Sequence, residues 1–199
     1  MQFYFLKTKV NLSFPFWAVV TLMLMLDRSN TAIITLISAV LHETGHLIMM
    51  YAFSAPPEKL TLGFFGMRID KRESSLSFLK ETIVALAGPI VNLIIALVSF
   101  VFYKFYCNEQ MLKISTINLM LGLFNLIPIE PLDGARAIKN TLSMFLDEQC
   151  IDKILNSILW FFLILLYWLS IKVINLSGYN FTLLIFCIYI SLCIIFKRR

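Results

Sequence analysis

The stretch that decides the fold is Thr31 to Phe53, TAIITLISAVLHETGHLIMMYAF, an apolar run long enough to cross a membrane as a helix. It contains two histidines and one glutamate within the segment His42-Glu43-Thr44-Gly45-His46. Ionisable groups are costly at membrane depth, so these three side chains need a compensating partner there. The run therefore predicts a membrane helix with a polar site inside it.

The spacing of the two histidines indicates a metal site. Side chains four residues apart lie about 40° apart around an α-helix, so His42 and His46 can bind one ion. Neutral imidazoles are zinc ligands, and zinc lowers the pKa of a bound water to about 7. The carboxylate of Glu43 can then take the proton, as in metal-assisted peptide hydrolysis. The segment predicts one zinc ion per chain, with Glu43 as the catalytic base.

Three competing interpretations of the motif are a chance match, a structural metal site and an inactive descendant of an enzyme. A chance match is disfavoured because His and Glu are rare in apolar spans and both histidines of the chain lie in this segment. Glu43 speaks against an inactive descendant, since loss of the base is the simplest route to one.

The composition predicts an all-α, polytopic membrane protein. Hydrophobic residues make up 59% of the 199 positions, whereas about half is usual in soluble domains. We expect about six transmembrane helices in one domain over residues 1–199, without a PDZ or CBS domain. The first is expected to be a retained span, because no small-residue cleavage site precedes Asp27. The expected spans are Val10 to Leu26, Thr31 to Phe53, Thr82 to Tyr106, Leu112 to Ile129, Ile154 to Leu176 and Phe181 to Phe196.

The segment between the second and third spans, Ser54 to Glu81, is the longest hydrophilic interval. Its apolar residues partly alternate, and Gly63 and Gly66 interrupt them. This pattern favours short strands with a bend over a helix. Two interpretations stay open: a strand-like segment that dips into the membrane beside the site, and an amphipathic loop on the bilayer surface.

Two histidines are only part of a catalytic zinc site, which usually takes three protein ligands and a water. The chain has no third His, so a carboxylate is expected to complete the set. Asp133 is the best candidate because Pro128 and Pro131 hold the chain at the end of the fourth span, where Asp-Gly favours a tight turn. Glu130, between these prolines, is the second candidate.

Three groups of residues together resemble one family. They are the His42 to His46 motif, Ala87-Gly88-Pro89 with Asn92, and Asn125-Leu126-Ile127-Pro128 followed by Pro131-Leu132-Asp133-Gly134. In this order and spacing the chain resembles the site-2 proteases, which are zinc intramembrane metalloproteases, and it is most like the stage IV sporulation protein FB subgroup.

The resemblance implies a metalloendopeptidase that cuts a membrane-tethered protein near the cytoplasmic face. It implies His42, His46 and Asp133 as zinc ligands, Glu43 as the base, and substrate positioning by Asn125, Pro128, Pro131 and Asn92. Regulated proteolysis of a transcription-factor precursor, regulatory membrane partners and a role in sporulation belong to the same expectation. Members of the subgroup commonly carry a C-terminal CBS domain, which we do not expect within residues 1–199. The chain also departs from the subgroup in having Ala135 where a second glycine is frequent, and in the additional charge of Glu130.

Two rival classes make different predictions. A transporter needs polar groups along a path through several spans, whereas here they concentrate in one constellation. A membrane protease that trims prenylated chain ends would use a helical glutamate as its third ligand, for which Glu81 is the candidate. Nucleic acid is not an expected partner.

The basic residues predict the topology. With six spans, thirteen of the 17 Lys and Arg lie on the side of the two termini, and the other side has only Arg28, Lys104, Lys113 and Lys172. Because basic loops stay in the cytoplasm, we expect both termini to be cytoplasmic.

Reporter fusions test this topology. A reporter placed after Arg199, and one placed within residues 71–77, should both be active in the cytoplasm, whereas a reporter near Asn108 should be active outside. A cytoplasmic signal near Asn108 would contradict the six-span arrangement.

Overall fold

The computed structural model describes residues 2–5, 8–12, 20–21, 24–27, 29–57, 59–63, 66–70, 76–129, 132–179, 181, 183–185, 187–188 and 191. The chain divides into two compact units, Met1–Phe145 and Leu146–Arg199. The elements of the first are β1 (Gln2–Phe5), β2 (Thr8–Leu12), α2 (Thr31–Ala52), β3 (Lys59–Gly63), β4 (Gly66–Asp70), α3 (Phe78–Tyr106), α4 (Glu109–Asn125) and α5 (Asp133–Leu142). The second contains α6 (Glu148–Ser177), in which Tyr167 shares a hydrogen bond of 3.1 Å with Ser191.

Three of the described helices, α2, α3 and α6, are long and apolar enough to cross a membrane. They match the second, third and fifth expected spans closely at their C-terminal ends. Helix α4 corresponds to the fourth but has only 17 residues. The last expected span, Phe181 to Phe196, lies largely outside the described residues. The full set of six spans therefore stays a prediction.

The start of the first expected span is wrong. Val10 to Leu12 belong to strand β2, and the helical residues described after it within this span are 20–21 and 24–26. Thr8 to Leu12 form a strand because they pair with two neighbours, antiparallel with β1 and parallel with β3. Such long-range pairing is not visible in the hydropathy of the segment.

The described strands form one sheet in the order β1-β2-β3-β4. Strands β3 and β4 are antiparallel, with Leu60 opposite Ile69 and Gly63 opposite Gly66. The interval after α2 therefore contains the short strands that its alternation favours, in a sheet that also includes the N-terminal strands. Its expected dip into the membrane stays a prediction.

Helix α2 begins after Asn30, donates a hydrogen bond to Asp27 from its first turn, and then packs closely on α3. Asp27 accepts hydrogen bonds from the backbone N–H groups of Ser29 and Ala32, at 2.9 and 2.7 Å, and these bonds lower the pKa of Asp27. Further along, Gly45 faces the backbone of Ala87: a Cβ on Gly45 would come within 2.9 Å of the Ala87 carbonyl oxygen. The missing side chain lets the two helices approach closely.

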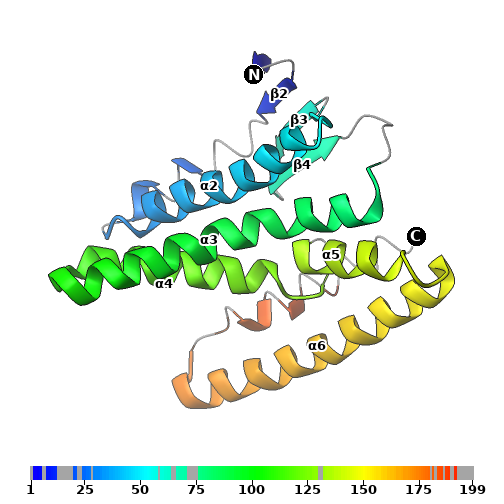
Figure 1. The fold of residues 1–199 in the computed structure, drawn as a ribbon. Helices are drawn as coiled ribbons and strands as arrows, with labels where there is room; N and C mark the ends of the chain where they lie inside the picture. The colour runs from blue at the N-terminus through cyan, green and yellow to red at the C-terminus, as the bar shows by residue number, and fades with distance from the viewer. Residues whose placement is uncertain are drawn as a thin grey trace. The chain divides into compact units, whose positions relative to one another are not determined.

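Helix α3 is the centre of this unit, because it contacts α2, α4 and α5 (Figure 1). Its contact with α4 uses small and polar residues: Ser115 donates a hydrogen bond of 2.7 Å to the Ala96 carbonyl oxygen. At Gly122 of α4, an added Cβ would lie 3.1 Å from the side chain of Leu93 and 3.3 Å from the carbonyl oxygen of Pro89. Pro89 itself lies inside α3.

The segment after α4 turns sharply and starts a helix, where sequence favoured a tight turn alone. The N–H of Leu132 donates to the Ile129 carbonyl oxygen at 2.8 Å, and α5 then begins at Asp133. A Cβ on Gly134 would collide with the carbonyl oxygen of Leu126, so glycine is needed for the first turn of α5 to lie against the end of α4. This contact sets the position of Asp133.

We expect Gly45→Ala to destabilise the first unit by about 1–3 kcal/mol, as overpacking of a tight interface usually does. The added methyl meets the backbone of Ala87, which cannot move without separating the helices. Thermal unfolding in detergent or nanodiscs measures the effect.

Gly122→Ala is the matched control, since its methyl meets the Leu93 side chain at 3.1 Å and the nearest backbone atom, the Pro89 carbonyl oxygen, only at 3.3 Å, and it should be tolerated better. Equal stability of the two variants would contradict close α2–α3 packing at Gly45.

Candidate metal centre

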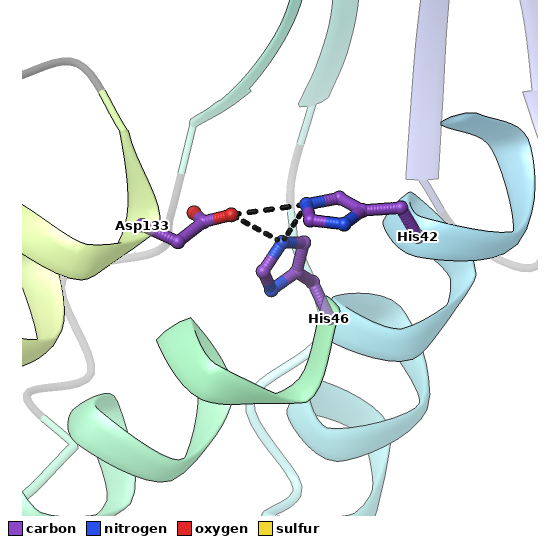
Figure 2. Close-up of side chains that lie close together, drawn as sticks. All are labelled: His42, His46 and Asp133. Carbon is purple, nitrogen blue, oxygen red and sulfur yellow. Dashed lines mark hydrogen bonds and ion pairs between the residues drawn. The ribbon is translucent and has the colours of Figure 1, made fainter. Parts of the chain in front are cut away.

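Three buried donor groups from two elements meet at one point. His42 and His46 extend from α2 and Asp133 from the first turn of α5, as Figure 2 shows. The Oδ2 atom of Asp133 lies 3.0 Å from His42 Nε2 and 3.2 Å from His46 Nε2, and the two Nε2 atoms are 3.2 Å apart. Among the described residues, this is the group of His, Cys, Asp and Glu side chains that could hold a metal ion.

The spacing of the three atoms fits zinc. Two ligands about 2.0–2.1 Å from zinc in a tetrahedral arrangement lie roughly 3.4 Å apart. The observed separations of 3.0 to 3.2 Å come close to this value. Two imidazoles and one carboxylate are also a donor set typical of catalytic zinc sites, which leave the fourth position open. The residues therefore fit the ion that the sequence motif predicts.

His46 is held in the tautomer that a metal ligand requires. Its Nδ1–H donates a hydrogen bond of 2.7 Å to the Val84 carbonyl oxygen on α3. With the proton on Nδ1, the lone pair on Nε2 faces His42 and Asp133. Ligating histidines commonly use their second nitrogen in this way to orient the ring. The backbone of α3 thus orients one ligand of α2.

Helix α3 also leaves space for the ligands at Gly88. A Cβ at this position would lie 2.7 Å from His42 Nε2 and still closer to His46 Nε2. Real Cβ atoms essentially never show such contacts, so no larger residue fits there without moving the imidazoles. Gly88 therefore allows both rings to sit against the backbone of α3.

Asp133 is ionised at neutral pH. Burial works to raise its pKa, but the contacts of its carboxylate with the two imidazole rings outweigh this effect and lower the pKa from 3.8 to about 2. Arg136, one turn along α5 and largely exposed, has its Nη1 atom 3.9 Å from Asp133 Oδ1. The third donor is thus an anionic oxygen, which complements two neutral imidazoles on a divalent cation.

The other predicted site residues occupy different positions around this group. Glu43 follows His42 on α2 and is half-buried, and Pro128 lies just after α4. Asn125 ends α4 and donates a hydrogen bond of 3.0 Å to the Leu121 carbonyl oxygen. Asn92 is completely buried in α3. Glu130 and Pro131 lie outside the described residues, and Glu81 is not part of the metal-ligand group.

Sequence reasoning did not assign roles to Gly88 and Gly134. Ala87-Gly88-Pro89 entered only as part of the family resemblance, and Asp133-Gly134 was expected to form a turn. The signal for Gly88 was its place in an apolar span beside a proline, but its position against the imidazoles depends on the pairing of α2 with α3.

Comparisons with known proteins identify related sequences. The model of peptidase family M50 matches residues 104–169. A zinc metalloprotease of Methanocaldococcus jannaschii is 34% identical, over 64% of this chain and 35% of the relative. YwhC of Bacillus subtilis, which is named for the same activity, is 31% identical over 54% of this chain and 67% of YwhC. Stage IV sporulation protein FB of the same organism is 27% identical over 77% of this chain and 55% of that protein.

The fold has a solved counterpart. The site-2 protease from Methanocaldococcus jannaschii superposes with a TM-score of 0.66 over 96% of this chain and 91% of that chain, at 24% identity. The present chain spans only about a third of the length of the archaeal zinc metalloprotease with which it aligns. The alignment with YwhC covers two thirds of that relative, and the M50 match includes α4 and Asp133. The chain belongs to peptidase family M50, the site-2 protease family of zinc metalloproteases.

Proposed function

We propose that this chain is an intramembrane endopeptidase that hydrolyses a peptide bond of a membrane-tethered protein near the cytoplasmic face. The observation that carries the proposal is the convergence of His42, His46 and Asp133 at one point. The two histidines and Glu43 lie on α2, a helix able to cross a membrane. A site of this kind within a span gives access to bonds in a membrane-embedded substrate, which a soluble protease cannot reach.

His42, His46 and Asp133 would hold the zinc ion. When bound, zinc acts as a Lewis acid that acidifies a water molecule and polarises the carbonyl group of the scissile bond. The buried face of α2 and the backbone of α3 hold the two imidazoles in place. Such preorganisation supports a catalytic role.

Glu43 would transfer the proton of the attacking water. Its carboxylate, next to the first ligand on α2, accepts the proton of the attacking water and delivers it to the leaving amine. Its partial exposure allows contact with water entering the site. The two imidazoles stay neutral throughout, because their Nε2 lone pairs serve as ligands.

The substrate must be unwound, because the amide groups of a helix are locked in internal hydrogen bonds. Strand β4 offers a way to hold the unwound segment, since it lies at the edge of the described sheet with β3 on its other side. An extended substrate chain could add to this edge through main-chain hydrogen bonds. Strands β3 and β4 would then act as the membrane-dipping pair.

Substrate positioning beside the metal would fall to Asn125, Pro128 and Pro131, at the end of α4 and the turn that leads to Asp133. Asn92 belongs to the same set by sequence, but its complete burial means that it would act through the ligand helices and not by touching the substrate.

The cellular setting follows the same proposal. The chain would be a multi-pass protein with cytoplasmic termini, regulated by other membrane proteins. Similarity to stage IV sporulation protein FB supports a role in sporulation. Regulated proteolysis of a transcription-factor precursor is part of the same proposal.

The role of Glu43 predicts that Glu43→Gln abolishes cleavage and keeps about one zinc ion per chain, because the base is lost and the ligands remain. Quantitative proteomics of membranes from cells that carry either form measures cleavage, since tethered substrates should accumulate uncut in the variant. Metal analysis of the purified proteins measures zinc. His42→Ala is the control, which should lose zinc as well as activity. Cleavage by Glu43→Gln at the wild-type rate would rule out this base.

The role of Asp133 as the third zinc ligand predicts that Asp133→Asn weakens zinc binding by about tenfold or more. The substitution keeps the size and polarity of the side chain but removes the anionic oxygen. Proteolysis should fall at least as far as metal occupancy. Competition with a zinc-binding dye measures the affinity.

Glu130→Gln is the matched carboxylate control and should be milder. Wild-type zinc binding by Asp133→Asn, together with a zinc-free Glu130→Gln, would show that Glu130 is the ligand.

A further inference from the structure

Four buried polar atoms in the described part of the chain have no hydrogen-bond partner. They are His42 Nδ1, both side-chain polar atoms of Asn92, and Asn118 Oδ1. They come from three different helices, α2, α3 and α4. Buried polar groups in proteins are almost always paired, with protein or with ordered water. The four atoms therefore point to a ligand if the three helices bring them together.

The pairing of α2 with α3 places Asn92 opposite one side of His42. The helices are antiparallel: His46 bonds to Val84, and Gly88 faces both imidazoles. One turn beyond Gly88 on α3 is Asn92, and one turn before His42 on α2 is Ser38. Residues four apart share a helix face, so Asn92 lies opposite the turn from Ser38 to His42.

Asn118 of α4 lies beside the same turn of α2. Its Nδ2 donates a hydrogen bond of 2.9 Å to Ser38 Oγ, which leaves its Oδ1 without a partner. The pairing of α4 with α3 agrees, since Ser115 bonds to Ala96 on one side and Gly122 lies against Pro89 and Leu93 on the other. Asn92, Asn118 and Ser38 are 0%, 1% and 2% exposed.

We propose that Ser38, Asn92 and Asn118 form a buried hydration site, and that a water bound there accepts the Nδ1–H proton of His42. The inference rests on the metal centre proposed above. With Nε2 as ligand, the neutral His42 ring carries its proton on Nδ1, and no described protein atom accepts it. His46 has the Val84 carbonyl oxygen for this purpose.

One water can pair three of the four atoms, all but Asn92 Oδ1. It can accept from His42 Nδ1–H and from Asn92 Nδ2–H, and donate to Asn118 Oδ1. Buried waters typically make about three such bonds to polar groups that would otherwise be unpaired. Asn92 is therefore a positioning residue, which orients a zinc ligand through water and does not touch the reacting atoms.

The chain is well suited to a direct test because it has only two histidines. Full-length protein labelled with ¹⁵N-histidine, loaded with zinc in lipid nanodiscs, gives one Nδ1–H signal per ligand. We expect cross-relaxation with water at the His42 signal and none at the His46 signal, which serves as the internal control.

The variant Asn92→Leu, of similar volume, should remove the water contact, shift the His42 signal and leave the His46 signal in place. Zinc affinity should fall about 10–100-fold, the usual effect of losing a partner of a ligating histidine. Ser115→Ala is the matched control, because it removes a buried hydrogen bond of the α3–α4 interface and should change neither signal. Asn92→Ser keeps a hydroxyl group for the water and should bind zinc nearly as well as the wild type.

Wild-type protein that binds zinc without a water contact at His42 would overturn the hydration site and leave the metal centre standing. Equal shifts of both histidine signals in Asn92→Leu, with unchanged zinc affinity, would overturn it too, since that result indicates loosened packing alone. Wild-type protein without affinity for zinc would overturn the metal centre and the hydration site together.

Discussion

The structure of the first unit depends on the need to satisfy polar atoms inside an apolar bundle. Burying an imidazole or a carboxylate alone in such surroundings is unfavourable, but the cost is offset when the three groups bind one cation. Each neighbouring element serves this arrangement. Helix α3 provides the Val84 carbonyl group and the space at Gly88, and α5 provides the anionic oxygen of Asp133. The close contact of α2 with α3 at Gly45 is what brings these groups within reach.

Much of this could be predicted from the sequence, because the signals are local. The spacing of His42 and His46 is a property of one helix, and α2 and α3 are long apolar runs whose C-terminal ends are easily placed. Asp133 was predictable as the third ligand because the chain has no third His and two prolines precede this residue. Composition alone also allowed other carboxylates, such as Glu81. The geometry of the donor atoms supports Asp133 over Glu81.

What the sequence did not reveal depends on pairing between distant segments. Strand β2 appeared as the start of an apolar span, because its partner β3 lies about 50 residues further along the chain. Helix α5 appeared as a turn, since its first residues Asp133 and Gly134 favour turns and are helical only where they lie against the end of α4. The bond between Asn118 and Ser38 joins two helices and has no signature in either one.

The origin of the ligands in two distant elements has a consequence for biosynthesis. Asp133 is 91 residues away from His42, so the ribosome must make α3, α4 and the start of α5 after it has made the histidines. At about 5–20 residues per second, this interval lasts on the order of 5–20 s. During that time the nascent chain carries an incomplete ligand set and cannot bind a metal ion through all three side chains. Late completion of the ligand set would thus delay activity until the helices of the first unit have been made.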